Sequence, residues 1–268
     1  DWNCGQYDAG SYGTPDASFK ALCTANLPAV AITNTGTAFQ AITATEDNID
    51  ANLATARSGW ANYVDIKKNY SASESWAWQF SHDSSNEYAI STGSVVRQAK
   101  RTNAGSNSWV GYSIRIGSAY GTAAGSVAHT NGAATTVTHS LGLTSRQLII
   151  LFPRAGGTSV KVFHPDLTSG SLIDLCSQSG QAANTTITNV TSTAFDIGSS
   201  VATGTYDYLV CSKLSGLLAL RKYASNGSTD GPCVIANQSP QLAIWKNLVT
   251  TSNWEAVDGV RRTYNVDE

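Results

Sequence analysis

Four carboxylate residues lie close together in the first third of the chain, and glycoside hydrolysis requires residues of this type. They are Asp65, Glu74, Asp83 and Glu87. A glycosidase places two such groups about 5 to 9.5 Å apart. However, Asp65 corresponds to Ala243 in a later repeat of the chain, so a carboxylate is not a constant feature of this position. We interpret these residues as solvated turn carboxylates and expect no enzyme activity, with glycan hydrolysis as the alternative.

Other catalytic and metal-binding patterns are weak. The histidines have no metal-binding spacing and are scattered along the chain at His82, His129, His139 and His164. A zinc site would need the fold to gather three such ligands, and the nearest candidates are His82-Asp83 and His164-Pro165-Asp166. Glu46–Asp50 is rich in oxygen ligands but lacks the spacing of a calcium loop. No Gly-x-Ser-x-Gly elbow is present. We therefore expect no metal and no cofactor.

The tryptophans could form a surface on which sugar rings stack. Trp76 and Trp254 recur at equivalent repeat positions, and Trp78 lies on the same side of a strand as Trp76. We expect these three side chains to pack in a core, and a core role is less secure for Trp245. Trp60 and Trp109 lie next to loops, so we predict that they are exposed and are the ligand-binding residues.

The composition excludes several classes of function. Charged residues make up 13% of the chain and the net charge is −2, so no electrostatic footprint for nucleic acid is present. The longest apolar runs, such as Leu148–Phe152, are far too short to span a bilayer. The five cysteines lack paired spacing, which favours reduced and buried thiols over a disulfide framework.

An internal repeat organises the chain. The segment from Val64 to Asn69, with Trp76 after it, recurs 178 residues later as Leu242 to Asn247 with Trp254. A looser copy, Gln147–Arg154 followed by Ser159–Phe163, lies between them. Such a period indicates tandem structural units. We place Lys68-Asn69 and Lys246-Asn247 at the turn of a hairpin that the tryptophans anchor.

The repeat predicts a mainly β fold of tandem antiparallel β-sandwich units. We assign residues 39–121 to unit 1, residues 122–216 to unit 2 and residues 217–268 to the first half of unit 3. The strands expected in units 1 and 2 are Phe39–Thr43, Tyr63–Lys67, Ser75–Phe80, Ala89–Ser94, Trp109–Ile116, Thr135–His139, Gln147–Phe152, Thr185–Val190, Ala194–Ile197 and Tyr206–Val210. We interpret the segment that contains Ile49 and Leu53 as an insertion-tolerant loop that can be helical. Before unit 1, Thr14-Pro15-Asp16 predicts the start of a short helix, with a hydroxyl cap and proline in the first turn.

Gly13–Pro28 resembles the segment that follows a lectin-like jelly-roll domain in tail-fibre and related structural proteins of tailed bacteriophages. Lys222–Pro232 with Pro240–Asn247, and Ala128–Gly132 with Thr135–Leu141, resemble their repeated module. In unit 1, Glu46-Asp47-Asn48-Ile49 replaces the Asn-Gly-Ser turn of the module, so this sequence departs from the family pattern there.

The resemblance implies a structural and adhesive segment of a tail fibre or related virion appendage that takes part in host recognition. It implies that residues 1–38 hold the end of an upstream jelly-roll domain, a short helix and a connector. It also implies a homo-oligomer, by analogy a trimer, with other virion proteins and a host-surface glycan as partners, and assembly in the bacterial cytoplasm. The family supplies no catalytic residue. The alternatives are a virion-associated glycan depolymerase and a carbohydrate-binding module of a bacterial surface.

Overall fold

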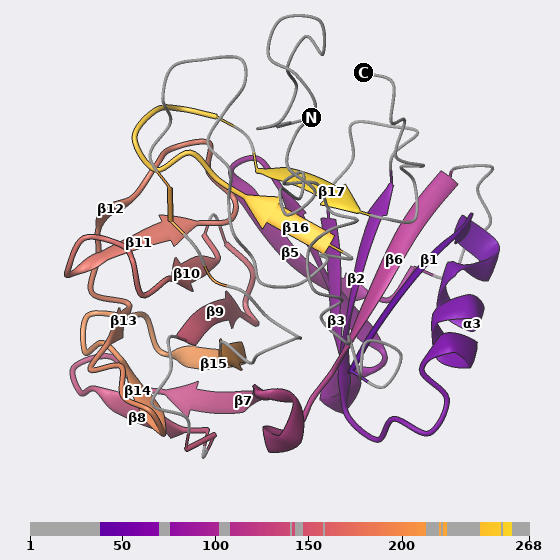
Figure 1. Ribbon diagram of the computed structural model, residues 1–268. Helices are drawn as coiled ribbons and strands as arrows, with labels where there is room; N and C mark the ends of the chain where they lie inside the picture. Colours follow the sequence, from indigo (N-terminus) through magenta and orange to yellow (C-terminus); the bar gives the residue numbers. More distant parts are fainter. Residues whose placement is uncertain are drawn as a thin grey trace, which may run out of the picture.

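The structure is a computed structural model. It describes residues 38–69, 76–101, 108–139, 141–142, 147–157, 159–212, 220, 222–223, 242–252 and 254–258. The predicted N-terminal helix at Thr14–Pro28 lies outside these residues, as does most of the predicted opening of unit 3. The prediction of a mainly β fold built from antiparallel, sandwich-like layers is confirmed (Figure 1).

The first sheet is antiparallel, has six strands and contains most of predicted unit 1. Its strands are β1 (Phe39–Thr45), β2 (Tyr63–Asn69), β3 (Trp76–Phe80), β4 (Asn86–Ser91), β5 (Ser94–Ala99) and β6 (Ser108–Arg115). Their order in the sheet is β1-β6-β2-β3-β4-β5. The helix α3 (Glu46–Ala56) joins β1 to β2, and the short 3-10 helices η2 (Ser81–Asp83) and η3 (Ser118–Tyr120) follow β3 and β6.

The second sheet also has six strands and belongs to predicted unit 2. Its strands are β7 (Thr122–His129), β9 (Gln147–Pro153), β10 (Lys161–Phe163), β11 (Ser171–Asp174), β12 (Ala182–Ala183) and β15 (Gly204–Ser212). The remaining strands of this unit form a third sheet and are β8 (Thr135–Thr138), β13 (Ile187–Thr188) and β14 (Ala194–Ile197). A separate hairpin consists of β16 (Leu242–Trp245) and β17 (Glu255–Asp258).

The two large sheets have the same strand order. The second sheet, followed from its first strand, runs β7-β15-β9-β10-β11-β12, which matches β1-β6-β2-β3-β4-β5 strand for strand. In both sheets the last strand of the unit inserts between the first and the second. The two units therefore share one topology, as copies of one ancestral unit would.

The hairpins of the repeat agree in register. Val64 pairs with Phe80 and Lys67 with Ala77 in β2–β3, and the residues 178 positions later form the corresponding pairs in β16–β17. In the looser copy, β9 pairs with β10 through Ile150 and Val162. The three copies of the recurring sequence thus form the same type of hairpin.

The two large sheets pack face to face over one core (Figure 1). Alternation along β2 directs Val64 and Ile66 into this core, and Phe152 of β9 reaches it from the other sheet. The strands of the two sheets cross at a large angle in Figure 1, as in orthogonal packing. The structure differs here from our expectation of two separate sandwiches, because one face of each large sheet packs against the other unit.

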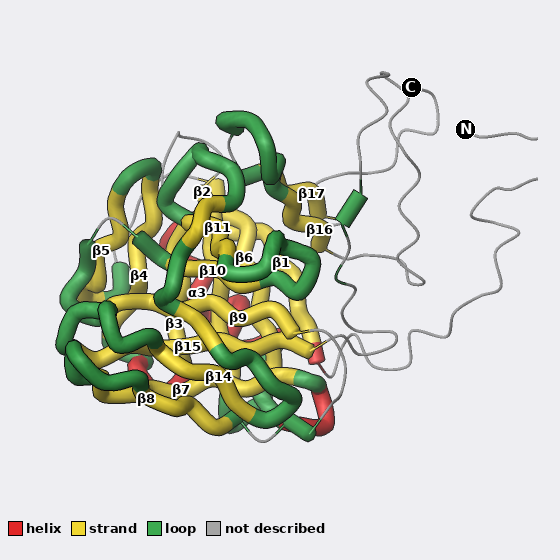
Figure 2. The backbone as a smooth tube through the Cα atoms, turned by 90° about the vertical axis from the view of Figure 1, so that its left-hand side faces the viewer, coloured by secondary structure: helices red, strands yellow, loops and turns green. Residues whose placement is uncertain are grey.

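Each large sheet has a different outer layer. The outer face of the second sheet is apolar and packs on the third sheet through Ile149, Phe195 and neighbouring side chains. The first sheet is covered by α3, which packs Ile49 and Leu53 on Trp109. In Figure 2 the strands of the second and third sheets face the viewer, and the helix lies behind them.

Two local predictions can be compared with the structure. The segment interpreted as a loop that can be helical is the helix α3, because Ile49 and Leu53, one helical turn apart, find an apolar site above the sheet. Gly111 makes room for them: a Cβ atom at this position would lie 2.8 Å from Ile49 Cδ1. The predicted strand Ala89–Ser94 contains a hairpin turn at Gly93, whose φ of 76° suits glycine, and so it divides between β4 and β5.

Candidate functional site

An aromatic–arginine cluster lies at one end of the first sheet and contains the predicted ligand residue Trp60. The cluster consists of Arg57, Trp60, Tyr63, Arg115 and Tyr120. The guanidinium carbon of Arg115 lies 5.6 Å from the centroid of the Trp60 ring and 4.7 Å from that of Tyr120. All five side chains are half-buried, so each keeps part of its surface open to solvent.

The local sequence explains why these residues meet. The chain leaves α3 through a turn at Gly59, whose φ is 81°, and the amide of Trp60 donates to the carbonyl of Arg57. Tyr63 then begins β2 and pairs across the sheet with Arg115, the last residue of β6. A tight turn between Gly117 and Gly121 brings Tyr120 back over Arg115. Four segments thus position the cluster: the turn after α3, strands β2 and β6, and the turn between Gly117 and Gly121.

Arg57 fixes the inner edge of the cluster. Its guanidinium carbon lies 3.7 Å from the centroid of the Tyr63 ring, and its nitrogens donate to the buried carboxylate of Asp65 at 3.1 to 3.3 Å. Burial raises the pKa of Asp65, although Arg57 and Ser113 oppose this. Burial also raises the pKa of Tyr63. The hydroxyl therefore stays protonated at neutral pH and can donate a hydrogen bond.

Trp109 does not join this cluster. It lies near the start of β6, whereas Arg115 ends this strand, and its side chain is only 2% exposed beneath Ile49 and Leu53 of α3. The prediction that Trp109 is exposed was wrong, because the segment interpreted as a loop is the helix that covers it. Its indole Nε1 has no hydrogen-bond partner among the described residues, and the guanidinium carbon of Arg101 lies 4.9 Å from its ring centroid.

The other tryptophans divide between the core and the surface. Trp78 is buried in the shared core, and Trp76 and Trp254 pack against that core while half-buried, so the expected packing role of these three is confirmed. Trp245 is 39% exposed on β16.

The carboxylates considered for glycoside hydrolysis are engaged by cations. Asp65 accepts from Arg57, and Asp83 accepts from Arg97 at 2.6 and 2.9 Å. Glu87 is buried with Lys67 at 2.8 Å and Arg101 at 2.6 Å. Burial raises the pKa of Glu87, but the charges and hydrogen bonds of these two cations bring it below its ordinary value. Asp65 and Glu87 are thus structural ion-pair partners, and Glu74 lies outside the described residues.

Sequence reasoning missed a buried polar site at Asp207 between the two sheets. Its carboxylate accepts from Tyr88 Oη at 2.6 Å and from Arg154 at 2.9 to 3.1 Å, and it lies 3.0 Å from His82 Nε2. Burial raises the pKa of Asp207, but these partners outweigh it and lower the pKa to about 2. The signal was the alternation of β15, which places Asp207 on the same face as the buried Leu209.

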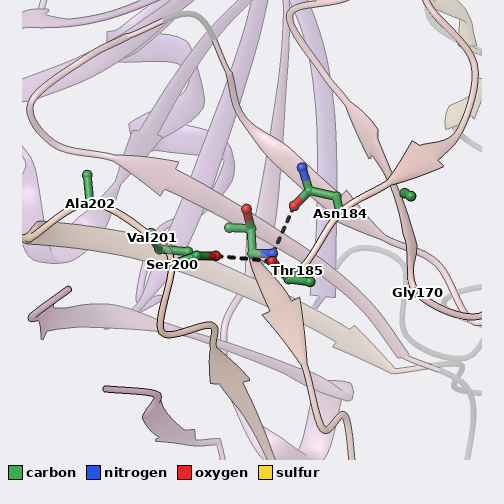
Figure 3. A pocket seen from close by; sticks show the side chains of 8 residues that line it. Gly170, Asn184, Thr185, Ser200, Val201 and Ala202 are labelled. Carbon is green, nitrogen blue, oxygen red and sulfur yellow. Dashed lines mark hydrogen bonds between the residues drawn. The ribbon is translucent and has the colours of Figure 1, made fainter. Parts of the chain in front are cut away.

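A shallow hollow of about 550 Å³ opens beside the third sheet (Figure 3). Its lining consists of small and hydroxyl-bearing or amide residues, namely Gly170, Ala183, Asn184, Thr185, Thr186, Ser200, Val201 and Ala202. Thr185 Oγ1 and Ser200 Oγ are 3.1 Å apart, and Asn184 Oδ1 accepts from the amide of Thr186. The lining has no charged or aromatic side chain, so the hollow lacks the stacking faces that the cluster provides.

Metal and thiol chemistry find little support in the described residues. No three His, Cys, Asp or Glu side chains gather there in a way that could hold a metal ion. Cys176 and Cys211 are free and buried, and burial raises the pKa of their thiols to about 11 and about 12. The other cysteines lie outside the described residues. No helix in the described part of the chain is long and apolar enough to cross a bilayer.

One family comparison matches most of the chain. The family model described as a domain of unknown function (DUF7483) matches residues 29–268. The chain belongs to this family. Neither the curated proteins nor the solved structures contain a match to the chain.

Proposed function

We propose that the chain is a structural and adhesive segment of a bacteriophage tail fibre or related virion appendage, and that the aromatic–arginine cluster binds a host-surface glycan. The observation that carries glycan binding is that the half-buried rings of Trp60 and Tyr120 both lie next to the guanidinium of Arg115. Sugars pack their C–H faces on aromatic rings, while an arginine donates hydrogen bonds in a fixed fork to hydroxyl or carboxylate oxygens.

The architecture supports the structural part of this proposal. The sheets are linked directly: the amide of Val95 on β5 donates to Gly157 of unit 2 at 2.9 Å, and the reverse bond is 3.0 Å. Together with the shared aromatic core, these bonds form a platform that holds the cluster in place. The resemblance of Gly13–Pro28 and Lys222–Pro232 to phage proteins supports the setting in a virion, a homo-oligomeric assembly and contacts with other virion proteins.

A binding experiment on the intact chain tests the role of the cluster. The chain would be applied to an array of bacterial surface glycans, and the affinity for the best ligand would be measured by calorimetry. Loss of an aromatic face is worth roughly 1 to 1.5 kcal/mol, so Trp60→Ala should weaken binding about tenfold.

The matched control is Trp245→Ala, which removes an exposed tryptophan from a different element. Its affinity should equal that of the unmodified chain, and circular dichroism should show that both variants are folded. Unchanged glycan binding by Trp60→Ala would refute the assignment of this cluster.

The same glycans distinguish adhesion from depolymerisation. Incubation with the chain should release no reducing sugar. Turnover that disappears in Asp83→Asn would instead identify a glycan depolymerase, and the adhesive proposal would be abandoned.

A further inference from the structure

The hairpin β16–β17 is a third copy of an element that is interior in the first two copies. In the first sheet, β2 pairs with β3 on one edge and with β6 on the other over seven residue pairs. In the second sheet, β9 likewise pairs with β10 and with β15, again over seven. Among the described residues β16 pairs with β17 alone. Its other edge is the one that β6 and β15 occupy in the first two copies.

Side-chain exposure agrees with this difference. Ile244 and Trp245 of β16 are 40% and 39% exposed. The equivalent residues Ile66 and Lys67 of β2 are buried, as are Ile150 and Leu151 of β9. Two large apolar side chains are therefore exposed on β16, whereas their counterparts in β2 and β9 are buried.

The hairpin is nevertheless held firmly at its other end. Lys246 Nζ donates to the carbonyls of Gln178 and Ser252, each at 2.6 Å. The amide of Ser252 donates to Gln178, and that of Gln181 donates to Leu248. Leu242, Leu248 and Trp254 pack against the shared core. The position of β16 is thus set by unit 2, and its edge is preformed.

We propose that β16 accepts an added strand from a partner polypeptide in antiparallel register, and that this strand has the pattern of β6 and β15. An exposed strand edge presents a row of backbone donors and acceptors that another extended segment can satisfy. The closing strands define the chemistry of the partner. They are eight and nine residues long, lack proline and direct alternate apolar side chains such as Val110, Tyr112 and Leu209 to the core side. This inference does not depend on glycan binding.

A peptide-binding experiment on the intact chain tests the proposal. The probe is a labelled peptide with the sequence of residues 108–116, and binding is followed by fluorescence anisotropy. Replacement of the peptide residue that corresponds to Tyr112 with proline removes a backbone donor in the centre of the strand, and it should weaken binding at least tenfold. Hydrogen exchange should slow at the amides of β16 when the unmodified peptide is added.

Two variants of the chain locate the binding edge. The double change Ile244→Lys and Trp245→Lys places charge against the incoming apolar strand and should lower affinity at least tenfold. Val249→Lys is the matched control, because Val249 is 88% exposed in the hairpin loop, and it should leave the affinity unchanged.

Three results would overturn the proposal. The first is absence of peptide binding, and the second is binding that both peptides and all variants share equally. The third is slow exchange at β16 in the free chain. If that protection occurs in a monomer, the edge is covered from within the chain, and if it occurs in a dimer, a second β16 occupies the edge.

Discussion

At the residue scale, Asp207 joins the two sheets through one buried carboxylate. Its donors come from both layers: Tyr88 lies on β4 of the first sheet, and Arg154 follows β9 of the second. A carboxylate in an apolar interface is costly unless several donors satisfy it. This site therefore specifies how the sheets are aligned, in addition to stabilising them.

The replacement Asp207→Asn should lower the free energy of unfolding by about 2 kcal/mol or more at pH 7, because it leaves Arg154 without its counter-charge. The folded-state pKa of Asp207 lies at about 2, below the ordinary value of 3.8. The stability that it contributes is therefore complete above pH 4 and is lost as the pH falls towards 2. Urea unfolding at pH 7, 4 and 2.5 measures both effects.

The variant should lack the part of the acid destabilisation that Asp207 causes, so its curve against pH should be flatter between pH 4 and 2. Tyr88→Phe should lower the free energy of unfolding by less than Asp207→Asn does. The loss in the double variant should be smaller than the sum of the two single losses, because the two side chains share a hydrogen bond. Equal pH dependence in the variant and the unmodified chain would contradict this account of Asp207.

Single residues also show how far the sequence predicts a site. The loop position of Trp60 led correctly to a partly open side chain, because a turn follows directly after α3. Nothing local to Trp60 indicates that Arg115 and Tyr120 lie beside it, since strand pairing between residues about fifty positions apart brings them together. The prediction for Trp109 was wrong for the same reason, because a helix that is distant in the sequence covers its side chain.

At the element scale, α3 shows why repeat comparison can mislead. The repeat aligned this segment with a glycine-rich stretch of another copy, which argued for a loop. Its buried stripe contains Ile49 and Leu53, which is a weak periodic signal over eleven residues. These two side chains pack over Gly111 on β6, and the lack of a side chain at this glycine leaves space for the helix. This relation is visible only in three dimensions.

Leu53→Ala should destabilise the fold by about 2 to 4 kcal/mol, because it opens a cavity between α3 and Trp109. Chemical unfolding gives the loss, and hydrogen exchange should show that the amides of α3 lose protection first. Asn52→Ala, on the exposed side of the same helix, is the matched control and should change stability by less than about 0.5 kcal/mol. Equal effects of the two changes would show that α3 is not held by this contact.

At the scale of the whole molecule, the two sheets depend on one core. The ring of Phe152 in the second sheet lies 5.1 to 5.5 Å from the rings of Trp78, Phe80 and Tyr88 in the first. The sequence predicted the strands and their repeat, because alternation and turn residues are local signals. It did not predict the shared core, because no local pattern shows that one face of each sheet packs against the other unit.

Phe152→Ala should lower the free energy of unfolding by about 3 to 5 kcal/mol, and both sheets should be destabilised together. Calorimetry should show one unfolding transition for the described layers, and amides of β2 and β9 should lose protection in parallel. Tyr223→Ala is a control at an exposed aromatic residue and should have little effect. Separate transitions, with the first sheet unaffected, would mean that each unit is stable alone.

The strand order of the two sheets has a mechanical consequence. Phe39 pairs with Ile114 and Thr122 pairs with Cys211, so the polypeptide enters and leaves each sheet at neighbouring points. Tension applied at these points would pull the first strand from the last one residue pair at a time, instead of shearing all the pairs at once. Each sheet would therefore yield at low force from this edge, and a series of such sheets would lengthen under load and absorb work before its attachments break.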